Sequence, residues 1–432
     1  MRLMSVIREA IIMGQTIAEK IFSKKIGKSV YADDIVTAKV DFLLSHDGLG
    51  PMAIDSFKEI NGIKVKNPDK ACFVIDHFVP SPARNYSLMQ QKVREFCKEQ
   101  NITCYDGGEG ICHQVVPEKG YVVPGDLVVG TDSHTCTYGA LNAFATGVGS
   151  TDAAAVLKTG ELWFRVPKTN KVVINGYLQT GVFAKDLVLY LAGRIRANGA
   201  NYKAIEFSGE AISKLCIDDR LTICNMSIEM GAKAGLMIAD NKTKLWLRKR
   251  TNREYETINP DVDAVYEKTY EFNACSIVPQ VSRPHQVDDV VPVKHVEGQK
   301  IQQAIIGTCT NGRLEDLRVA ARILKGKKLA QGIRLIVVPA SRTVLSEAIE
   351  QGIIQTFVEA GGMVITPGCG PCVGSHSGIP SDGETVISTA NRNFKGRSGN
   401  AHSSVYLASP ATVAASAVTG YITDPRNMIG GC

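Results

Sequence analysis

Short apolar runs rich in β-branched residues alternate with amphipathic helical patterns along most of the chain. In the last third, Leu314, Leu317, Ala321 and Leu324 fall on one face of a helix predicted over residues 314–324. This alternation is typical of α/β proteins with parallel sheets. The predicted strands are Cys72–Ile75, Ile102–Tyr105, Leu127–Val129, Lys171–Ile174, Ala304–Ile306, Arg334–Val338, Met363–Ile365 and Thr385–Ile387.

The chain is too long for one compact core, since 432 residues favour roughly two to four domains. We predict three α/β domains, at residues 1–166, 167–285 and 286–432. The polar segment from Pro284 to Gly298 contains two prolines and is expected to be a linker. The charged stretch Lys242–Glu256 is expected to form a solvated surface helix and loop.

Composition indicates a folded globular protein, with 44% hydrophobic and 21% charged residues. The segment Met1–Ala10 lacks the apolar core of a secretory signal, and Met13 is an alternative start. No apolar run of about 18 residues predicts a membrane span, so we expect a cytoplasmic protein. A net charge of +6 suits small anionic substrates and is too dilute to indicate nucleic-acid binding.

The twelve cysteines are expected to be reduced, so metal binding is favoured over disulfides. Two cysteine motifs follow predicted strands directly: Gly-Thr-Cys-Thr-Asn-Gly-Arg over 307–313 and Pro-Gly-Cys-Gly-Pro-Cys over 367–372. Because the carboxyl ends of parallel strands line a common crevice, Cys309, Cys369 and Cys372 can converge there. Glycines in both loops would let the backbone approach a cluster closely.

Three thiolates are an informative number. A structural zinc site takes four ligands, and a 4Fe-4S cluster usually takes four cysteines. A cluster with three leaves one iron open to act as a Lewis acid. The alternatives are a zinc knuckle, or a Cys-x-x-Cys redox pair to which Cys309 is unrelated.

Three of the eight histidines follow predicted strands in the first region, beside acidic residues. They belong to Asp76-His77, to the glycine-rich loop ending at His113, and to Asp132-Ser133-His134. A carboxylate beside a histidine fixes its tautomer and raises its pKa, which suits a general acid. Alternatively, Asp132 or Ser133 caps a helix, and a single histidine is more often structural.

Together, the two cysteine motifs resemble the cluster-binding signature of the aconitase superfamily, and the resemblance extends from about Met13 to about Gly420. It implies a three-domain large subunit in which parallel-sheet α/β domains surround a central iron–sulfur cleft. It also implies one 4Fe-4S cluster with three cysteine ligands, Cys309, Cys369 and Cys372, and one open iron.

The resemblance carries site residues onto this chain. Those implied to be catalytic are Asp76, His77, His113, Asp132, His134 and Glu229, and those implied to bind substrate are His46, Ser133, Asn225, Arg392 and Arg397. By analogy Glu229 pairs with His134 and Asp132 with His113. Asn225 and Glu229, four residues apart, are expected to share one helical face.

The two arginines and His46 also indicate the kind of substrate. Guanidinium groups bind carboxylates through paired hydrogen bonds, which suits Arg392 and Arg397, although a basic surface turn is the alternative. His46 stands where aconitase itself has a glutamine, which is typical of the isopropylmalate and homoaconitate branch. The foremost candidate is therefore 3-isopropylmalate, of leucine biosynthesis. Homocitrate or homoaconitate, 2,3-dimethylmalate, and citraconate or methylmalate remain open.

The implied reaction is dehydration and rehydration of a hydroxy acid, with His77 as proton donor. In this family the base is a serine on a fourth, swivelling domain, for which the chain is too short. We therefore expect a small partner subunit, in a heterodimer or heterotetramer, and no activity without it. Hypotheses of another class are a zinc or electron-transfer protein and an RNA-binding regulator. The lack of a dense basic stripe counts against the regulator.

Overall fold

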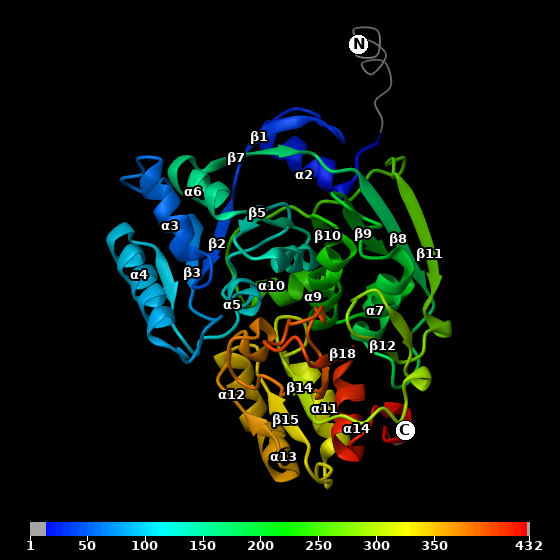
Figure 1. Ribbon diagram of the computed structural model, residues 1–432. Coiled ribbons are helices and arrows are strands. Elements are labelled where there is room, and N and C mark those ends of the chain that lie inside the picture. The colour runs from blue at the N-terminus through cyan, green and yellow to red at the C-terminus, as the bar shows by residue number, and fades with distance from the viewer. Residues whose placement is uncertain (1–13, 430–432) are drawn as a thin grey trace.

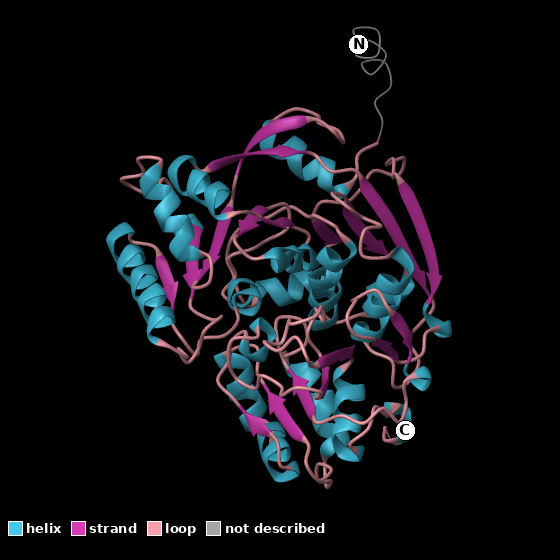
Figure 2. Ribbon diagram, in the orientation of Figure 1, coloured by secondary structure: helices cyan, strands magenta, loops and turns pink. Residues whose placement is uncertain are grey.

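The computed structural model describes residues 14–429. Met1–Ala10 and the alternative start at Met13 lie outside the described residues. Three sheets surround a central group of helices that includes α5 and α9, as Figure 1 shows, and the helices pack on the sheets (Figure 2). Within the described range, every helix is too short or too polar to cross a membrane.

The first sheet is parallel, in the order β4-β3-β2-β5-β6. The chain runs outward from β2 in one direction and from β5 in the other, so its topological switch point lies between these two strands, where α/β sheets bind ligands. The strands are β2 (Phe42–His46), β3 (Ala71–Val74), β4 (Thr103–Tyr105), β5 (Leu127–Gly130) and β6 (Phe144–Gly147). The associated helices are α2 (Ile17–Ile26), α3 (Gly50–Glu59), α4 (Arg84–Gln100), α5 (Cys112–Glu118) and α6 (Ser150–Thr159), and β1 (Ile35–Lys39) pairs with β7 (Glu161–Arg165) in a two-stranded ribbon.

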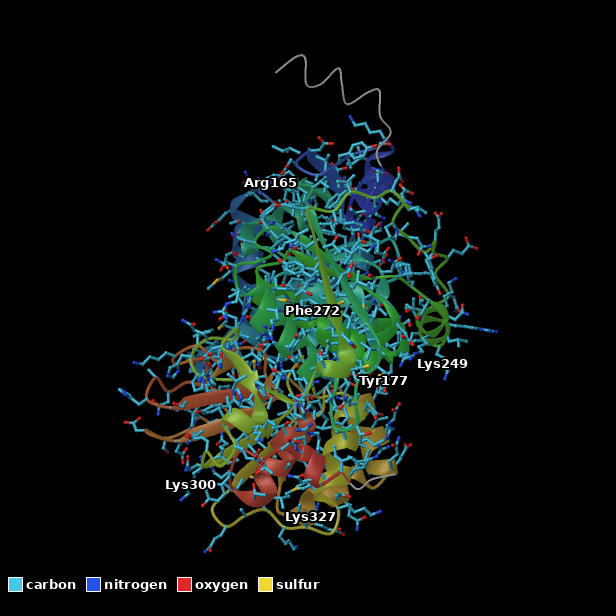
Figure 3. All side chains as sticks on the ribbon, turned by 90° about the vertical axis from the view of Figure 1, so that its right-hand side faces the viewer. Arg165, Tyr177, Lys249, Phe272, Lys300 and Lys327 are labelled. Atoms are coloured by element: carbon cyan, nitrogen blue, oxygen red, sulfur yellow. The ribbon has the colours of Figure 1, made fainter. Side chains whose placement is uncertain are left out.

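The second sheet is also parallel, in the order β10-β9-β8-β11. Figure 3 views the molecule from the side of this sheet, with Phe272 of β11 labelled between Arg165 above and Tyr177 below. The strands are β8 (Thr169–Asn175), β9 (Ala204–Ser208), β10 (Ala234–Met237) and β11 (Lys268–Asn273), and the helices are α7 (Ala184–Ile195), α8 (Glu210–Lys214), α9 (Ile217–Asn225) and α10 (Asn241–Arg248). The predicted charged surface helix corresponds to α10, although its Leu247 is buried.

The third sheet has the order β13-β12-β18-β17-β14-β15-β16, antiparallel only where β12 pairs with β13 and β18. Its switch point lies between β14 and β17. The strands are β12 (Gln280–Ser282), β13 (Val290–Pro292), β14 (Gln303–Ile306), β15 (Arg334–Val337), β16 (Met363–Val364), β17 (Thr385–Ser388) and β18 (Ser404–Ala408). The helices are α11 (Leu314–Leu324), α12 (Arg342–Glu350), α13 (Ile353–Ala360) and α14 (Pro410–Thr419).

Each predicted strand has a counterpart, and α11 coincides with the predicted helix. The linker prediction was wrong in part, because residues 290–292 form β13 and pair with β12. Pro292 is tolerated there because β13 is the edge strand of the sheet and needs no hydrogen bonds on its outer side. The division into three domains at residues 166 and 285 stays a prediction.

One apolar cluster joins all three sheets, and it includes Leu44, Ile174 and Ile305. Backbone hydrogen bonds also connect the first and third sheets directly, from Ile111 N to Ala340 O at 2.9 Å and from Cys369 N to Asp76 O at 2.8 Å. These contacts hold the loops that follow the strands of the first sheet against the loops that follow the strands of the third.

Candidate active site

Asp132, which follows β5, is the centre of the histidine cluster. Its carboxylate lies 2.8 Å from His113 Nε2 and 3.4 Å from His77 Nε2. It also caps the 3-10 helix Ser133–Leu141 by accepting from the backbone N–H of His134. Burial would raise the pKa of Asp132, but His113, His134 and His77 hold it well below its usual range. Asp132 is therefore both a helix cap and the shared anion of several histidines.

His77 lies between two carboxylates. Its Nδ1 is 2.6 Å from Asp76 Oδ1, and the other oxygen of Asp76 accepts from Cys112 N at 2.7 Å. Burial alone would lower the pKa of His77, but Asp76 and Asp132 raise it well above 6.5. A histidine that stays protonated at neutral pH can donate a proton to a departing hydroxyl.

Asp47 was not assigned from the sequence, and it anchors the loop that carries His77. Its carboxylate accepts backbone N–H groups from Asp76, His77 and Phe78 at 2.9–3.2 Å, and the amide of Gln90 at 3.1 Å. The ligand atoms of His46, Asp47, Asp76 and His77 lie within 4.8 Å of one another, as they could around a metal ion. The Asp47 oxygens are already occupied by these donors, so we interpret the group as a hydrogen-bonded support. The sequence feature that could have identified Asp47 is an acidic residue directly after a buried strand.

His46, at the end of β2, stacks on His77 with ring centroids 3.9 Å apart. Burial lowers the pKa of His46 to about 4, and the charge of His77 acts in the same direction. Its Nδ1 accepts the N–H of Gly48 at 3.1 Å, so the neutral ring carries its proton on Nε2. That buried donor has no partner among the described residues.

His134, Glu229 and Arg392 form a second chain of contacts. Glu229 Oε1 lies 3.0 Å from His134 Nε2 and 2.7 Å from Arg392 Nε, and Arg392 Nη2 donates to Ser133 Oγ at 3.0 Å. Burial would lower the pKa of His134, but Asp132 and Glu229 raise it. The predicted pairs Glu229–His134 and Asp132–His113 are thus confirmed as contacts.

Asn225 and Glu229 do not share an α-helical face, so that prediction was wrong. Helix α9 ends at Asn225, and Glu229 belongs to the following 3-10 turn Met226–Met230. The tighter turn sends the two side chains to different groups. Asn225 Nδ2 donates to Cys309 Sγ at 3.2 Å, whereas Glu229 contacts His134.

The three motif cysteines are buried and converge as predicted. The amide of Asn391, just after β17, joins two of them, with Nδ2 donating to Cys309 Sγ at 3.2 Å and Oδ1 lying 3.8 Å from Cys372 Sγ. Gly368 lets the Cys369 loop approach the first sheet, since a Cβ there would lie 2.9 Å from Asp76 O. Asn391 was not assigned from the sequence, although it directly precedes the predicted substrate residue Arg392.

Polar groups around the sulfurs suit thiolates. Cys369 and the Arg397 guanidinium, which donates to Cys372 Sγ at 3.4 Å, hold the pKa of Cys372 well below its usual range. Burial raises the pKa of Cys309 to about 12, so its deprotonation requires a positive partner. Three thiols with N–H donors directed at two of them fit a metal–sulfur centre.

Arg313, the last residue of the first cysteine motif, is a supporting residue that sequence reasoning missed. It is 1% exposed and donates to the carbonyls of Cys309 and Thr310 at 2.9 and 2.8 Å, and to Gln114 Oε1 at 3.0 Å. Thr308 has a φ of +69°, which is unusual for a β-branched residue. The hydrogen bonds of Arg313 therefore stabilise the strained backbone conformation of the loop that carries Cys309.

A cavity of about 740 Å³ lies at the histidine cluster around Asp132. Its lining includes the predicted residues His46, His77, Asp132, Ser133, His134, Arg392 and Arg397. Arg397 Nε, like His46 Nε2, is a buried donor without a partner among residues 14–429. The other predicted residues connect to this lining through the contacts above. Two unsatisfied donors beside Arg392 suit an anionic ligand.

Comparison with known proteins agrees with this geometry. A model of the aconitase family (aconitate hydratase) matches residues 19–420. The chain is 54% identical over 420 residues to 3-isopropylmalate dehydratase large subunit 1 of Thermotoga maritima, covering 96% of this chain and 100% of the relative. It is 52% identical over 418 residues to 3-isopropylmalate dehydratase large subunit 2 of Archaeoglobus fulgidus, with the same coverage. It is 51% identical over 392 residues to a probable methanogen homoaconitase large subunit of Methanosarcina mazei, covering 90% of this chain and 100% of the relative.

Proposed function

Because the chain belongs to the aconitase family, we propose that it is the large, cluster-carrying subunit of a hydro-lyase that dehydrates and rehydrates 3-isopropylmalate. One observation carries the proposal: a single cavity with unsatisfied donors is lined both by Arg397, which donates to the buried Cys372 thiol, and by His77, which pairs with Asp76. The names of the relatives support the substrate.

The family implies an iron–sulfur cluster, and we propose a 4Fe-4S cluster held by Cys309, Cys369 and Cys372. When bound, such a cluster supplies an iron without a protein ligand, which polarises a hydroxyl as a Lewis acid. The amides of Asn225 and Asn391 orient the Cys309 sulfur, and Arg397 stabilises Cys372 as a thiolate.

The remaining residues bind the substrate and move its proton. Arg392, fixed by Glu229 and Ser133, and Arg397 bind the substrate carboxylates. His77 delivers a proton to the departing hydroxyl, and Asp76 holds the ring in place. The unpartnered Nε2 of His46 donates to a substrate oxygen. His113 and His134 fix Asp132, which in turn contacts His77.

A small partner subunit completes the site in this proposal. The matched relatives are named large subunits, and we place the base that removes the substrate carbon-bound proton on the partner. The two then form a heterodimer or heterotetramer in the cytoplasm, where thiols stay reduced.

The test is to purify the chain anaerobically with and without the small subunit encoded in the same genome. We expect turnover of 3-isopropylmalate, followed by the ultraviolet absorbance of the unsaturated acid, only in the complex. Faster turnover of homocitrate or homoaconitate would favour the second candidate, a homoaconitase, which one relative's name supports. Activity of the chain alone, or inactivity of the complex on all these acids and on 2,3-dimethylmalate and citraconate, would overturn the proposal.

A further inference from the structure

Lys185 is a fully buried lysine that contacts the loop after β17. It lies in the first turn of α7, and its side chain is 0% exposed. Its ammonium donates to the carbonyl of Thr389 at 2.8 Å and to that of Ala390 at 2.6 Å. Both carbonyls follow β17, at the switch point of the third sheet.

These two carbonyls immediately precede the residues that reach the sulfurs and the cavity. Asn391 contacts Cys309 and Cys372, and Arg392 pairs with Glu229. The Lys185 ammonium therefore holds the backbone from which both side chains project.

The charge of Lys185 has no ordinary counter-ion. Within the described part of the chain, no carboxylate oxygen lies within 4.0 Å of its ammonium. The neighbouring Asp186 is used elsewhere, because it accepts backbone N–H groups of Gln280 and Phe183, each at 2.9 Å. A buried, unpaired ammonium is costly, and the positive end of a helix dipole makes it more so.

The negative groups that act on Lys185 include two cysteines of the proposed metal centre. Burial lowers the pKa of Lys185 to about 7, and the charges of Cys309, Asp316 and Cys372 act in the opposite direction. Asp316 is a weak counter-ion, since burial raises its own pKa to about 7. Glu229, whose charge acts in the same direction, is already shared by His134 and Arg392, so the cysteine thiolates remain as counter-charges for Lys185.

We propose that Lys185 is a positioning residue of the metal centre, whose ammonium balances the buried thiolate charge and holds Asn391 against Cys309 and Cys372. The inference rests on the proposed three-cysteine cluster. A fixed positive charge favours adding an electron to a nearby cluster. Losing it makes one-electron reduction less favourable, by at least tenfold in the equilibrium constant, or about 59 mV.

Two variants separate charge from hydrogen bonding in the full chain, reconstituted anaerobically with iron and sulfide. Lys185→Gln keeps N–H donors without the charge, and Lys185→Met removes both. Lys242→Met is the matched control, because Lys242 also donates to carbonyls, those of Ser213, Lys214 and Leu215, on an exposed helix. The readout is an electron-paramagnetic-resonance redox titration, together with iron and sulfide content and circular dichroism.

We expect both Lys185 variants to titrate at more negative potential, or to hold less cluster with an unchanged dichroism spectrum, while Lys242→Met matches the parent. A parental potential and cluster content in Lys185→Gln would overturn the role of the charge, even if Lys185→Met did not fold. If the parent itself bound no iron–sulfur cluster, the proposed function would fail as well, which distinguishes the two failures.

Discussion

His46 stacks on His77 at 3.9 Å between ring centroids, and the two rings are driven to opposite charge states. Burial and His77 lower the pKa of His46 to about 4, whereas Asp76 and Asp132 raise that of His77 despite its burial. One ring is thus a neutral donor and the other a proton source, which is a useful pairing for acid catalysis.

The lowered pKa of His46 predicts a pH-dependent stability. Between pH 6.5 and about 4 the unfolded histidine is protonated and the folded one is not, so the free energy of unfolding falls as pH falls through this window. In this window, His46→Gln should reduce the slope of the free energy of unfolding against pH by about 1.4 kcal/mol per pH unit relative to the parent. Urea unfolding at several pH values measures it. His402→Gln, at an exposed histidine, should keep the parental slope.

Asp76→Asn should weaken the acid. Losing the carboxylate 2.6 Å from His77 lowers the histidine pKa, so the alkaline limb of the pH–rate profile moves to lower pH. The rate at the optimum should fall roughly 10²–10⁴-fold. The assay uses the complex with the small subunit, and the exposed Asp69→Asn is the control. An unmoved profile would assign the essential acid elsewhere.

Cys309→Ser should abolish the visible iron–sulfur absorbance and the activity together, because a serine hydroxyl replaces a thiolate that Asn225 and Asn391 orient. Iron and sulfide analysis after anaerobic reconstitution checks it. Cys216→Ser removes an exposed thiol and should retain both properties. Zinc without sulfide in the parent would instead support the structural-zinc hypothesis.

Arg392→Lys should raise KM for the substrate at least about tenfold while leaving cluster content unchanged. The guanidinium contacts Glu229 and Ser133 at once, and an ammonium cannot keep that geometry and also bind a carboxylate. Steady-state kinetics of the complex measures the effect, with the exposed Arg322→Lys as control. An unchanged KM would remove Arg392 from the carboxylate site.

Local patterns were sufficient to predict eight of the strands and α11, because a buried parallel strand and an amphipathic helix each have a distinct apolar period, but other strands such as β2, β9 and β18 were not predicted. The same patterns also predicted which residues follow strand ends, and hence the meeting of Cys309 with Cys372, whereas the pairing of Asp132 with His113 came from the family resemblance. The edge strand β13 was missed, since prolines that signal a linker are equally suited to a sheet edge.

The supporting residues could not be predicted in the same way. Lys185 and Asp47 act through backbone groups that are distant in sequence, such as the carbonyls after β17 that Lys185 contacts, and Arg313 reaches the distant side chain of Gln114. The residues that neighbour each of these side chains in the sequence form no pattern that predicts such contacts. The change from α9 into a 3-10 helix at Met226 was also not predicted, and it directs Asn225 and Glu229 to different groups.

The apolar cluster shared by the three sheets has a mechanical consequence. Sheets joined by a continuous hydrophobic interior resist hinge or shear displacement against one another. The parts of the cavity wall that this chain supplies are therefore expected to stay rigid. Entry of the proposed substrate and release of the product would then depend on movement of the small partner subunit that we propose completes the site.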